Sequence, residues 1–142
     1  RRVLFRSFEG LRLTSYEDQA NVWTVGYGTT RINGRPVQRG DTITAADAVT
    51  YLRHDTDTIC AALDDAVPRD LTQNEVDALV SFCYNLGLGA FRGSSLRKAL
   101  VKNTRIDESL FTRWNKIRIN GVLQPSDGLL RRRRAEYALF IS

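Results

Sequence analysis

The stretch Trp23-Thr-Val-Gly-Tyr-Gly28 alternates large apolar residues with small or polar ones, which is the two-residue period of a β-strand. Asn33-Gly34 follows it and is a typical signal for a tight hairpin turn. These features predict a small, glycine-rich antiparallel sheet between Leu11 and about Thr42.

Helical periodicity flanks this predicted sheet on both sides. Apolar residues at helical spacing predict a short helix over residues 1–9, which Gly10 would end. On the other side, Thr44-Ala-Ala-Asp47 has the pattern of a capping box, and an apolar stripe continues from it towards Pro68. We therefore expect one long helix over residues 45–66.

The rest of the chain is also predicted to be helical. Thr72-Gln-Asn-Glu75 is a second capping-box pattern, and it opens a helix that should end at Gly87. Further helices are expected to begin near Ser94-Ser95, Asp107 and Asp127. The predicted fold class is α+β and mainly helical.

Size and composition limit the kinds of protein that this chain can be. Its 142 residues suit a single domain, and a hydrophobic content of 42% with 26% charged residues excludes both disorder and a membrane span. The formal net charge of +5 favours an anionic partner, which could be nucleic acid, a membrane surface or the bacterial envelope. The chain begins at Arg1 and contains no Met, so we expect an initiator residue or a leader to be missing from it.

The few cysteine and histidine residues limit the chemistry. Cys60 and Cys83 lack the spacing of a zinc or redox motif, so buried free thiols are the default expectation, with one bridge conceivable. A single histidine, His54, argues against histidine-based metal sites and catalytic triads. We therefore expect no metal and no cofactor, and chemistry that depends on carboxylates and hydroxyls.

Glu9 is the first candidate for that chemistry. It would lie in the last turn of the first predicted helix, where the helix dipole and apolar neighbours disfavour a carboxylate. Both effects raise the pKa, as a general acid requires, although a solvated Glu at a frayed helix end is the plain alternative. Taken alone, Asp18 has the character of a turn former and Thr24 that of an ordinary strand residue.

The combination of these residues resembles the catalytic segment of phage-type lysozymes, the endolysins of glycoside hydrolase family 24. Glu9-Gly10, then Tyr16 and Asp18, then Val22-Trp-Thr-Val-Gly-Tyr-Gly28 occur at the spacing of that family. The similarity continues along the chain through four more segments: Leu71–Gly87, Ala90–Leu96, Arg113-Trp114 and Gly128–Glu136.

The resemblance implies a fold and a set of roles. It implies one lysozyme-like catalytic domain over residues 1–142, with a small α/β lobe (about 1–44), a connecting helix (45–66), a helical lobe (67–142) and the sugar chain in a cleft between the lobes. It implies that Glu9 protonates the leaving oxygen while Asp18 and Thr24 assist water. Four further residues are implied to bind substrate: Thr30, Tyr84, Asn85 and Ser95.

One position departs from the family pattern. Many relatives have His after the Gly-x-Gly of the strand, whereas this chain has Thr29. If that His pairs with the acidic residue that Asp55 matches, at most a neutral hydrogen bond replaces the ion pair here.

By this resemblance the function is an endolysin, a muramidase that hydrolyses the β-1,4 bond between N-acetylmuramic acid and N-acetylglucosamine. Its partner would be the glycan strands of peptidoglycan in the host periplasm, and it would be a monomer without nucleic acid. Three alternatives stay open: a nucleic-acid-binding helical protein, suggested by Arg131-Arg-Arg-Arg134, a wall-binding module without activity, and a lytic transglycosylase. The four arginines would fan around a helix, so we expect one or two of them to be packed.

Overall fold

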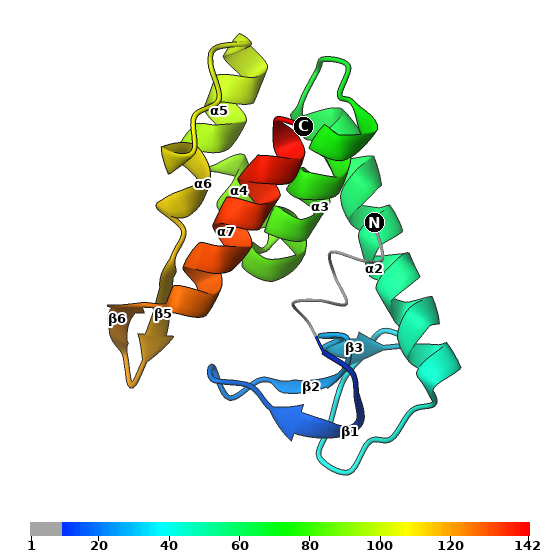
Figure 1. Cartoon of the computed structure of the whole chain (residues 1–142). Helices are drawn as coiled ribbons and strands as arrows, with labels where there is room; N and C mark the ends of the chain where they lie inside the picture. Colours follow the sequence, from blue (N-terminus) through cyan, green and yellow to red (C-terminus); the bar gives the residue numbers. More distant parts are fainter. Residues whose placement is uncertain (1–9) are drawn as a thin grey trace. The chain divides into compact units, whose positions relative to one another are not determined.

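The computed structural model describes residues 10–142, which form two compact units (Figure 1). Of the described residues, the first unit comprises 10–55 together with 118–122, and the second comprises 56–117 together with 123–142. The helix expected over residues 1–9 lies outside the described residues. None of the helices in the described part has the length and apolar character that a membrane crossing requires.

The sheet of the first unit consists of short antiparallel pairs. Strand β1 (Arg12–Glu17) pairs with β2 (Trp23–Gly26), so that Tyr16 lies opposite Thr24. Strand β3 (Arg31–Ile32) pairs with β4 (Arg35–Pro36) across Asn33-Gly34. Both turn residues have positive φ angles, 50° and 81°, which confirms the predicted hairpin turn.

A small apolar core stabilises the first unit. Val25, Ile32 and Val37 are buried in it, and Trp23, Ile43 and Tyr51 pack against them. Gly26 has φ of +67°, and a Cβ atom there would lie 3.1 Å from Ile43 Cδ1 and 3.4 Å from Ala48 Cβ. Glycine is required at this position because it provides both the backbone angle and the space.

Two helices begin and end where the sequence predicts. Helix α2 (Ala45–Ala66) starts with a reciprocal cap, in which Asp47 N donates to Thr44 Oγ1 at 3.0 Å and Thr44 N donates to Asp47 Oδ2 at 3.1 Å. Helix α3 (Gln73–Leu86) has a full capping box between Thr72 and Glu75, and Gly87 ends it. The prediction of a long helix at residues 45–66 is confirmed.

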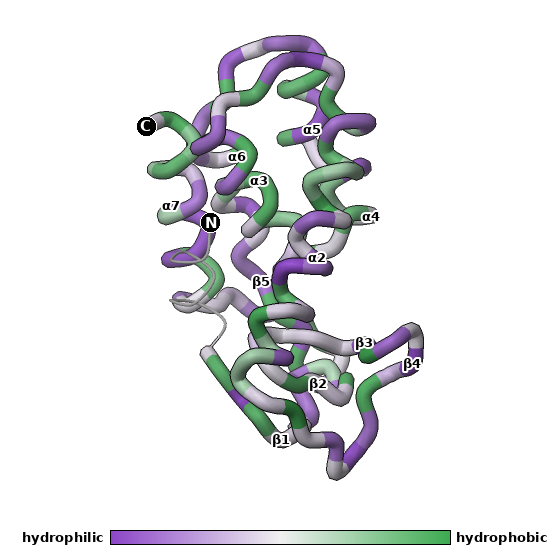
Figure 2. The backbone as a smooth tube through the Cα atoms, turned by 90° about the vertical axis from the view of Figure 1, so that its right-hand side faces the viewer, coloured by the Kyte–Doolittle hydropathy of each residue, from purple (hydrophilic) through white to green (hydrophobic). Residues whose placement is uncertain are grey.

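The second unit has an aromatic core between helices. Helix α3 packs against α7 (Asp127–Phe140), and Phe82 of α3 contacts Phe91, Phe111 and Trp114 edge to face, with ring centroids 5.8–6.1 Å apart. The hydropathy colouring of Figure 2 alternates between green and purple along these helices, as one-sided burial requires. Three short helices complete the unit: α4 (Leu88–Arg92), α5 (Ser95–Lys102) and α6 (Ser109–Thr112).

The segment before α7 differs from the prediction. It forms a hairpin of β5 (Lys116–Ile119) and β6 (Val122–Pro125), whereas a helical region was expected. Asn120 and Gly121 form its turn with positive φ angles of 50° and 78°, the same chemistry as the other hairpin. The helix expected from Asp107 is only one turn long, α6, and Trp114 lies beyond its end.

Two predictions about individual side chains are confirmed. Cys60 and Cys83 form no disulfide bond, and burial raises the pKa of the Cys83 thiol to about 12. In the arginine run, Arg132 and Arg133 are buried while Arg131 and Arg134 are exposed.

Candidate active site

The turn between β1 and β2 fixes the carboxylate of Asp18. Asp18 Oδ1 accepts two backbone hydrogen bonds, from Ala20 N at 2.8 Å and from Val22 N at 2.9 Å. The backbone closes the same turn, because Asp18 N donates to Val22 O and Asn21 N donates to Asp18 O, each at 3.0 Å. This is the Asx geometry that a turn aspartate favours. The other oxygen, Oδ2, forms no hydrogen bond with the described residues.

Thr24 lies on β2 and is buried, with 4% of its surface exposed. Its hydroxyl donates to Val22 O at 2.9 Å. A hydroxyl that donates one hydrogen bond keeps its lone pairs as acceptors. The structure thus brings Thr24 and Asp18 together around one residue, Val22.

An open pocket lies beside the Asp18 turn in the first unit. It is lined by Gln19, Ala20 and Asn21 of the turn and by residues 118–121 at the tip of the β5–β6 hairpin. The hairpin residues were not among the predicted site residues. The alternating Lys116-Ile-Arg-Ile119 followed by the dipeptide Asn120-Gly121 is the sequence signal that could have indicated a hairpin there.

The remaining predicted residues are divided between the units. Thr30 is exposed in the first unit, whereas Tyr84, Asn85 and Ser95 belong to the second. Asn85 and Ser95 are exposed, and Ser95 Oγ accepts a hydrogen bond from Arg113 Nη1 at 3.1 Å. The N-cap of α5 is Ser94, so Ser95 is not occupied by capping. Glu9 lies outside the described residues.

Thr29 and Asp55 do not form even the neutral hydrogen bond that the sequence allowed. Thr29 Oγ1 is buried and has no hydrogen-bond partner among the described residues. Burial raises the pKa of Asp55, and the nearby His54 acts in the opposite direction. Thr29 carries no positive charge and so cannot lower the pKa of Asp55, which is consistent with the raised value.

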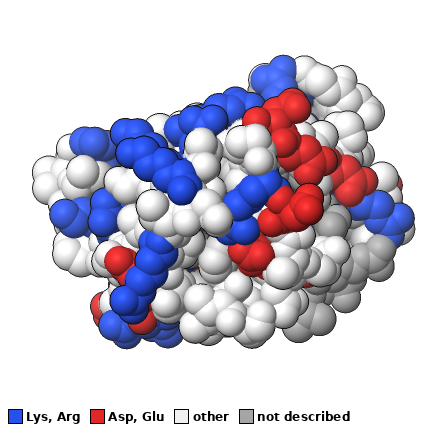
Figure 3. Space-filling view, turned by 90° about the horizontal axis from the view of Figure 1, so that it is seen from above, with Lys and Arg blue, Asp and Glu red and all other residues white. Residues whose placement is uncertain are grey.

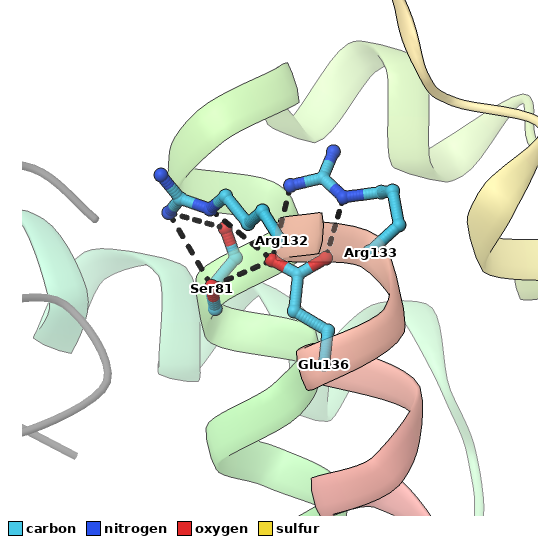
Figure 4. Close-up of polar contacts among 4 residues, drawn as sticks. All are labelled: Ser81, Arg132, Arg133 and Glu136. Carbon is cyan, nitrogen blue, oxygen red and sulfur yellow. Dashed lines mark hydrogen bonds and ion pairs between the residues drawn. The ribbon is translucent and has the colours of Figure 1, made fainter. Parts of the chain in front are cut away.

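A buried charged cluster in the second unit joins α3 to α7 (Figure 4). Glu136 is fully buried and lies 2.6 Å from Arg133 Nε, and its Oε2 accepts a hydrogen bond from Ser81 Oγ at 2.6 Å. Arg132 donates to Ser81 O at 3.2 Å and lies 3.4 Å from Glu136. Burial raises the pKa of Glu136, while Arg133, Ser81 and Arg132 act in the opposite direction. These buried contacts link α7 to α3, which supports a role of the cluster in holding the two helices together.

Residues 10–142 contain no group of three or more His, Cys, Asp or Glu side chains that could hold a metal ion. Within the same residues, the Asp18 turn presents a carboxylate with one oxygen held by two backbone amides and one oxygen available.

Comparisons with known proteins agree along the whole chain. A family model described as phage lysozyme matches residues 6–136. The endolysin of Acyrthosiphon pisum secondary endosymbiont phage 1 is 40% identical over 141 residues, which covers 99% of this chain and 94% of the relative. The endolysin of Salmonella phage P22 is 38% identical over 136 residues, which covers 94% of this chain and 90% of the relative.

A solved structure is equally similar. An endolysin from Escherichia coli O157:H7 phage FAHEc1 matches with a TM-score of 0.89 and 40% identity, covering 99% of this chain and 89% of that one. Sequence and structure therefore point to the same group of proteins.

Proposed function

Because this chain belongs to the phage lysozyme family and is a muramidase-type glycoside hydrolase, we propose that it hydrolyses the β-1,4 bond between N-acetylmuramic acid and N-acetylglucosamine. As an endolysin of this family it acts on host peptidoglycan. We propose that it acts in the periplasm as a monomer. Its single catalytic domain would consist of lobes at about 1–44 and 67–142, joined by the helix of residues 45–66.

The proposed reaction uses three side chains. Glu9 donates a proton to the glycosidic oxygen as its bond to the anomeric carbon breaks. A water molecule attacks that carbon, and Asp18 accepts a proton from the water while its charge stabilises the positive charge of the sugar. Thr24 positions the water through its hydroxyl oxygen.

The observation that carries this proposal is the connection of Asp18 and Thr24 through Val22. Two backbone amides hold Asp18 Oδ1, so the carboxylate cannot rotate freely, while Oδ2 stays available for water among the described residues. Thr24 Oγ1 donates to the carbonyl of the same residue whose amide holds Asp18. A carboxylate and a hydroxyl fixed in this way form a preorganised pair.

Substrate binding is proposed for Thr30, Tyr84, Asn85 and Ser95. The exposure of Thr30, Asn85 and Ser95 supports this role, since exposed hydroxyl and amide groups can exchange hydrogen bonds with sugar hydroxyls. Ser95 accepts one hydrogen bond from Arg113 and keeps its own proton to donate.

Mass analysis of the fragments released from purified peptidoglycan tests the function. Hydrolysis adds one water to each cut bond and leaves a reducing end, whereas a lytic transglycosylase leaves a 1,6-anhydro end that lacks this water. The first anomer formed, followed by proton NMR before mutarotation, tests the role of water: direct attack inverts the centre and gives the α-anomer. An initial β-anomer would make Asp18 a nucleophile, and an anhydro product would reject hydrolysis.

A further inference from the structure

Charge is strongly segregated along this chain. Residues 40–87 contain nine acidic residues and two basic ones, whereas residues 88–142 contain twelve basic residues and four acidic ones. Figure 3 shows the same division on the surface: Lys and Arg gather mainly over the side where α5 and α6 lie, and Asp and Glu mainly over the side of α2 and α3. The net charge of +5 for the whole chain is therefore the sum of a net −7 over residues 40–87, a net +8 over residues 88–142 and a net +4 over residues 1–39.

Four exposed residues of the second unit form what we call the basic face: Lys98, Lys102, Arg105 and Arg113. Lys98 and Lys102 lie one helical turn apart on α5, on the same stripe as Ser95. Arg113 joins the start of this stripe, because its guanidinium donates to Ser95 Oγ at 3.1 Å. Arg105 follows shortly after the end of the helix.

The charges of the basic face are available to a partner. Within residues 10–142, Lys98 and Lys102 form no ion pair, whereas Arg105 interacts electrostatically with Asp107. The exposed ion pair with Glu108 is formed by Arg134, which is not part of the basic face. Glu136 of α7 is buried in ion pairs with Arg132 and Arg133, so its carboxylate does not neutralise the basic face. Unneutralised surface charges of one sign attract a polyanion over several ångströms, and salt screens that attraction.

The kind of polyanion follows from what the basic face lacks. Every Phe, Tyr and Trp side chain among the described residues is buried or half-buried, so the basic face offers no fully exposed ring on which a nucleic-acid base could stack. The large apolar residue exposed on α5 is Val101. Point charges without a stacking platform suit a flexible polymer that carries separate carboxylates.

We propose that the basic face docks the carboxylates of the peptide stems of peptidoglycan, outside the sites where sugar is held. The proposal rests on the proposed function, because it assigns a second contact with the same polymer. Its continuity with Ser95, a proposed sugar-binding residue, places this contact beside the glycan strand that the enzyme cuts. The basic face would keep the enzyme on the wall between one cleavage and the next.

The test compares two variants with equal charge changes. Lys98→Gln with Lys102→Gln removes two charges from the basic face, and Arg39→Glu, at an exposed position of the first unit, also lowers the net charge by two. Binding to purified sacculi is measured by co-sedimentation at 4 °C in low and high salt. Turnover is measured separately on soluble glycan strands from which the peptides have been removed.

We expect the double variant to bind sacculi roughly tenfold more weakly than the wild type in low salt, because each basic residue near an anionic surface adds a small favourable term to the binding free energy. High salt should remove the difference. Arg39→Glu should bind like the wild type, and both variants should cut peptide-free strands at the wild-type rate. Sacculi whose carboxylates have been amidated should bind the wild type as weakly as untreated sacculi bind the double variant.

Several results would overturn the proposal. They are unchanged binding by the double variant, an equal loss in Arg39→Glu, an equal loss of turnover on peptide-free strands, and undiminished wild-type binding to amidated sacculi. Tighter, lysine-dependent binding to a short DNA duplex than to sacculi would assign the face to nucleic acid instead. If the wild type cut no glycan at all, the proposed function would fail while the binding measurements still decided the docking surface.

Discussion

Asp18 and Thr24 bind opposite groups of the same residue: the amide of Val22 donates to Asp18 Oδ1 at 2.9 Å, and the carbonyl of Val22 accepts from Thr24 Oγ1 at 2.9 Å. A substitution of either residue can therefore alter the position of the other side chain through the backbone of Val22. The Asp18 carboxylate also has two separable functions, since Oδ1 holds the turn and Oδ2 is left for chemistry.

Two substitutions of Asp18 separate these functions. Asp18→Asn keeps an oxygen that accepts from Ala20 and Val22, so we expect stability near that of the wild type but activity lower by at least about 10²-fold, because the charge is lost. Asp18→Ala should lose the activity and also about 1–2 kcal/mol of stability. Wall-clearing rates and urea denaturation measure the two effects. Glu17→Gln, at the exposed neighbouring carboxylate, is the control that should retain activity.

Glu9→Gln tests the proposed general acid. The amide cannot donate an acidic proton to the leaving oxygen, so we expect a loss of about 10²-fold to 10⁴-fold in wall-clearing activity. The melting temperature should stay equal or rise, because the carboxylate opposes the dipole of the helix that the sequence predicts over residues 1–9. Wild-type activity in a variant that melts normally would exclude Glu9 from this role.

The buried cluster predicts a large effect on stability. Glu136→Gln removes the buried carboxylate that forms ion pairs with Arg132 and Arg133, which should cost about 3–5 kcal/mol in the free energy of unfolding. Glu108→Gln breaks the exposed pair with Arg134, whose side chains are 50% and 62% exposed, and should cost about 0–1 kcal/mol. Chemical denaturation of the two variants compares the same substitution at a buried and an exposed site. Equal effects would contradict the structural role of the cluster.

Asp55 predicts a pH dependence of stability. Burial raises its pKa, so the folded protein holds this proton to a higher pH than the unfolded chain does. The protonated carboxyl is favoured below the unfolded value, and stability is lost as the pH rises through the raised pKa. Asp55→Asn should therefore be more stable than the wild type at neutral pH, and the difference should shrink as the pH falls below the unfolded value. Thermal melts across this range measure it, with the exposed Asp57→Asn on the same helix as the control.

The sequence predicted those elements whose signals are local. The capping boxes at Thr44 and Thr72 located the starts of two helices, and the likeness to the solved phage endolysin confirms the α+β, mainly helical, lysozyme-like fold class. The β5–β6 hairpin was missed because its second strand, Val122–Pro125, has no two-residue period, although Lys116-Ile-Arg-Ile119 alternates polar and apolar residues and Asn120-Gly121 is a hairpin dipeptide.

The sequence predicted which residues belong to the candidate active site, but not how Asp18 and Thr24 are arranged in space. That Asp18 and Thr24 meet at Val22 depends on the conformation of the turn, in which Asn21 has a φ angle of 61°. Glu136 escaped notice for a different reason, because a charged residue in a polar helix normally lies on the surface. Its burial follows from the packing of α7 against α3, where Ser81 donates a hydrogen bond to it and Arg132 and Arg133 form ion pairs with it.

The β3–β4 hairpin has a consequence for protein engineering. Its turn, Asn33-Gly34, is exposed, nothing lies within 4 Å of a Cβ added at Gly34, and the flanking strands have only two residues each. Exposed loop tips of this kind tolerate insertions, provided that the buried Ile32 and Val37 on either side are kept. A reporter or an additional wall-targeting module spliced between Asn33 and Gly34 would thus be carried within the chain, leaving both termini unaltered.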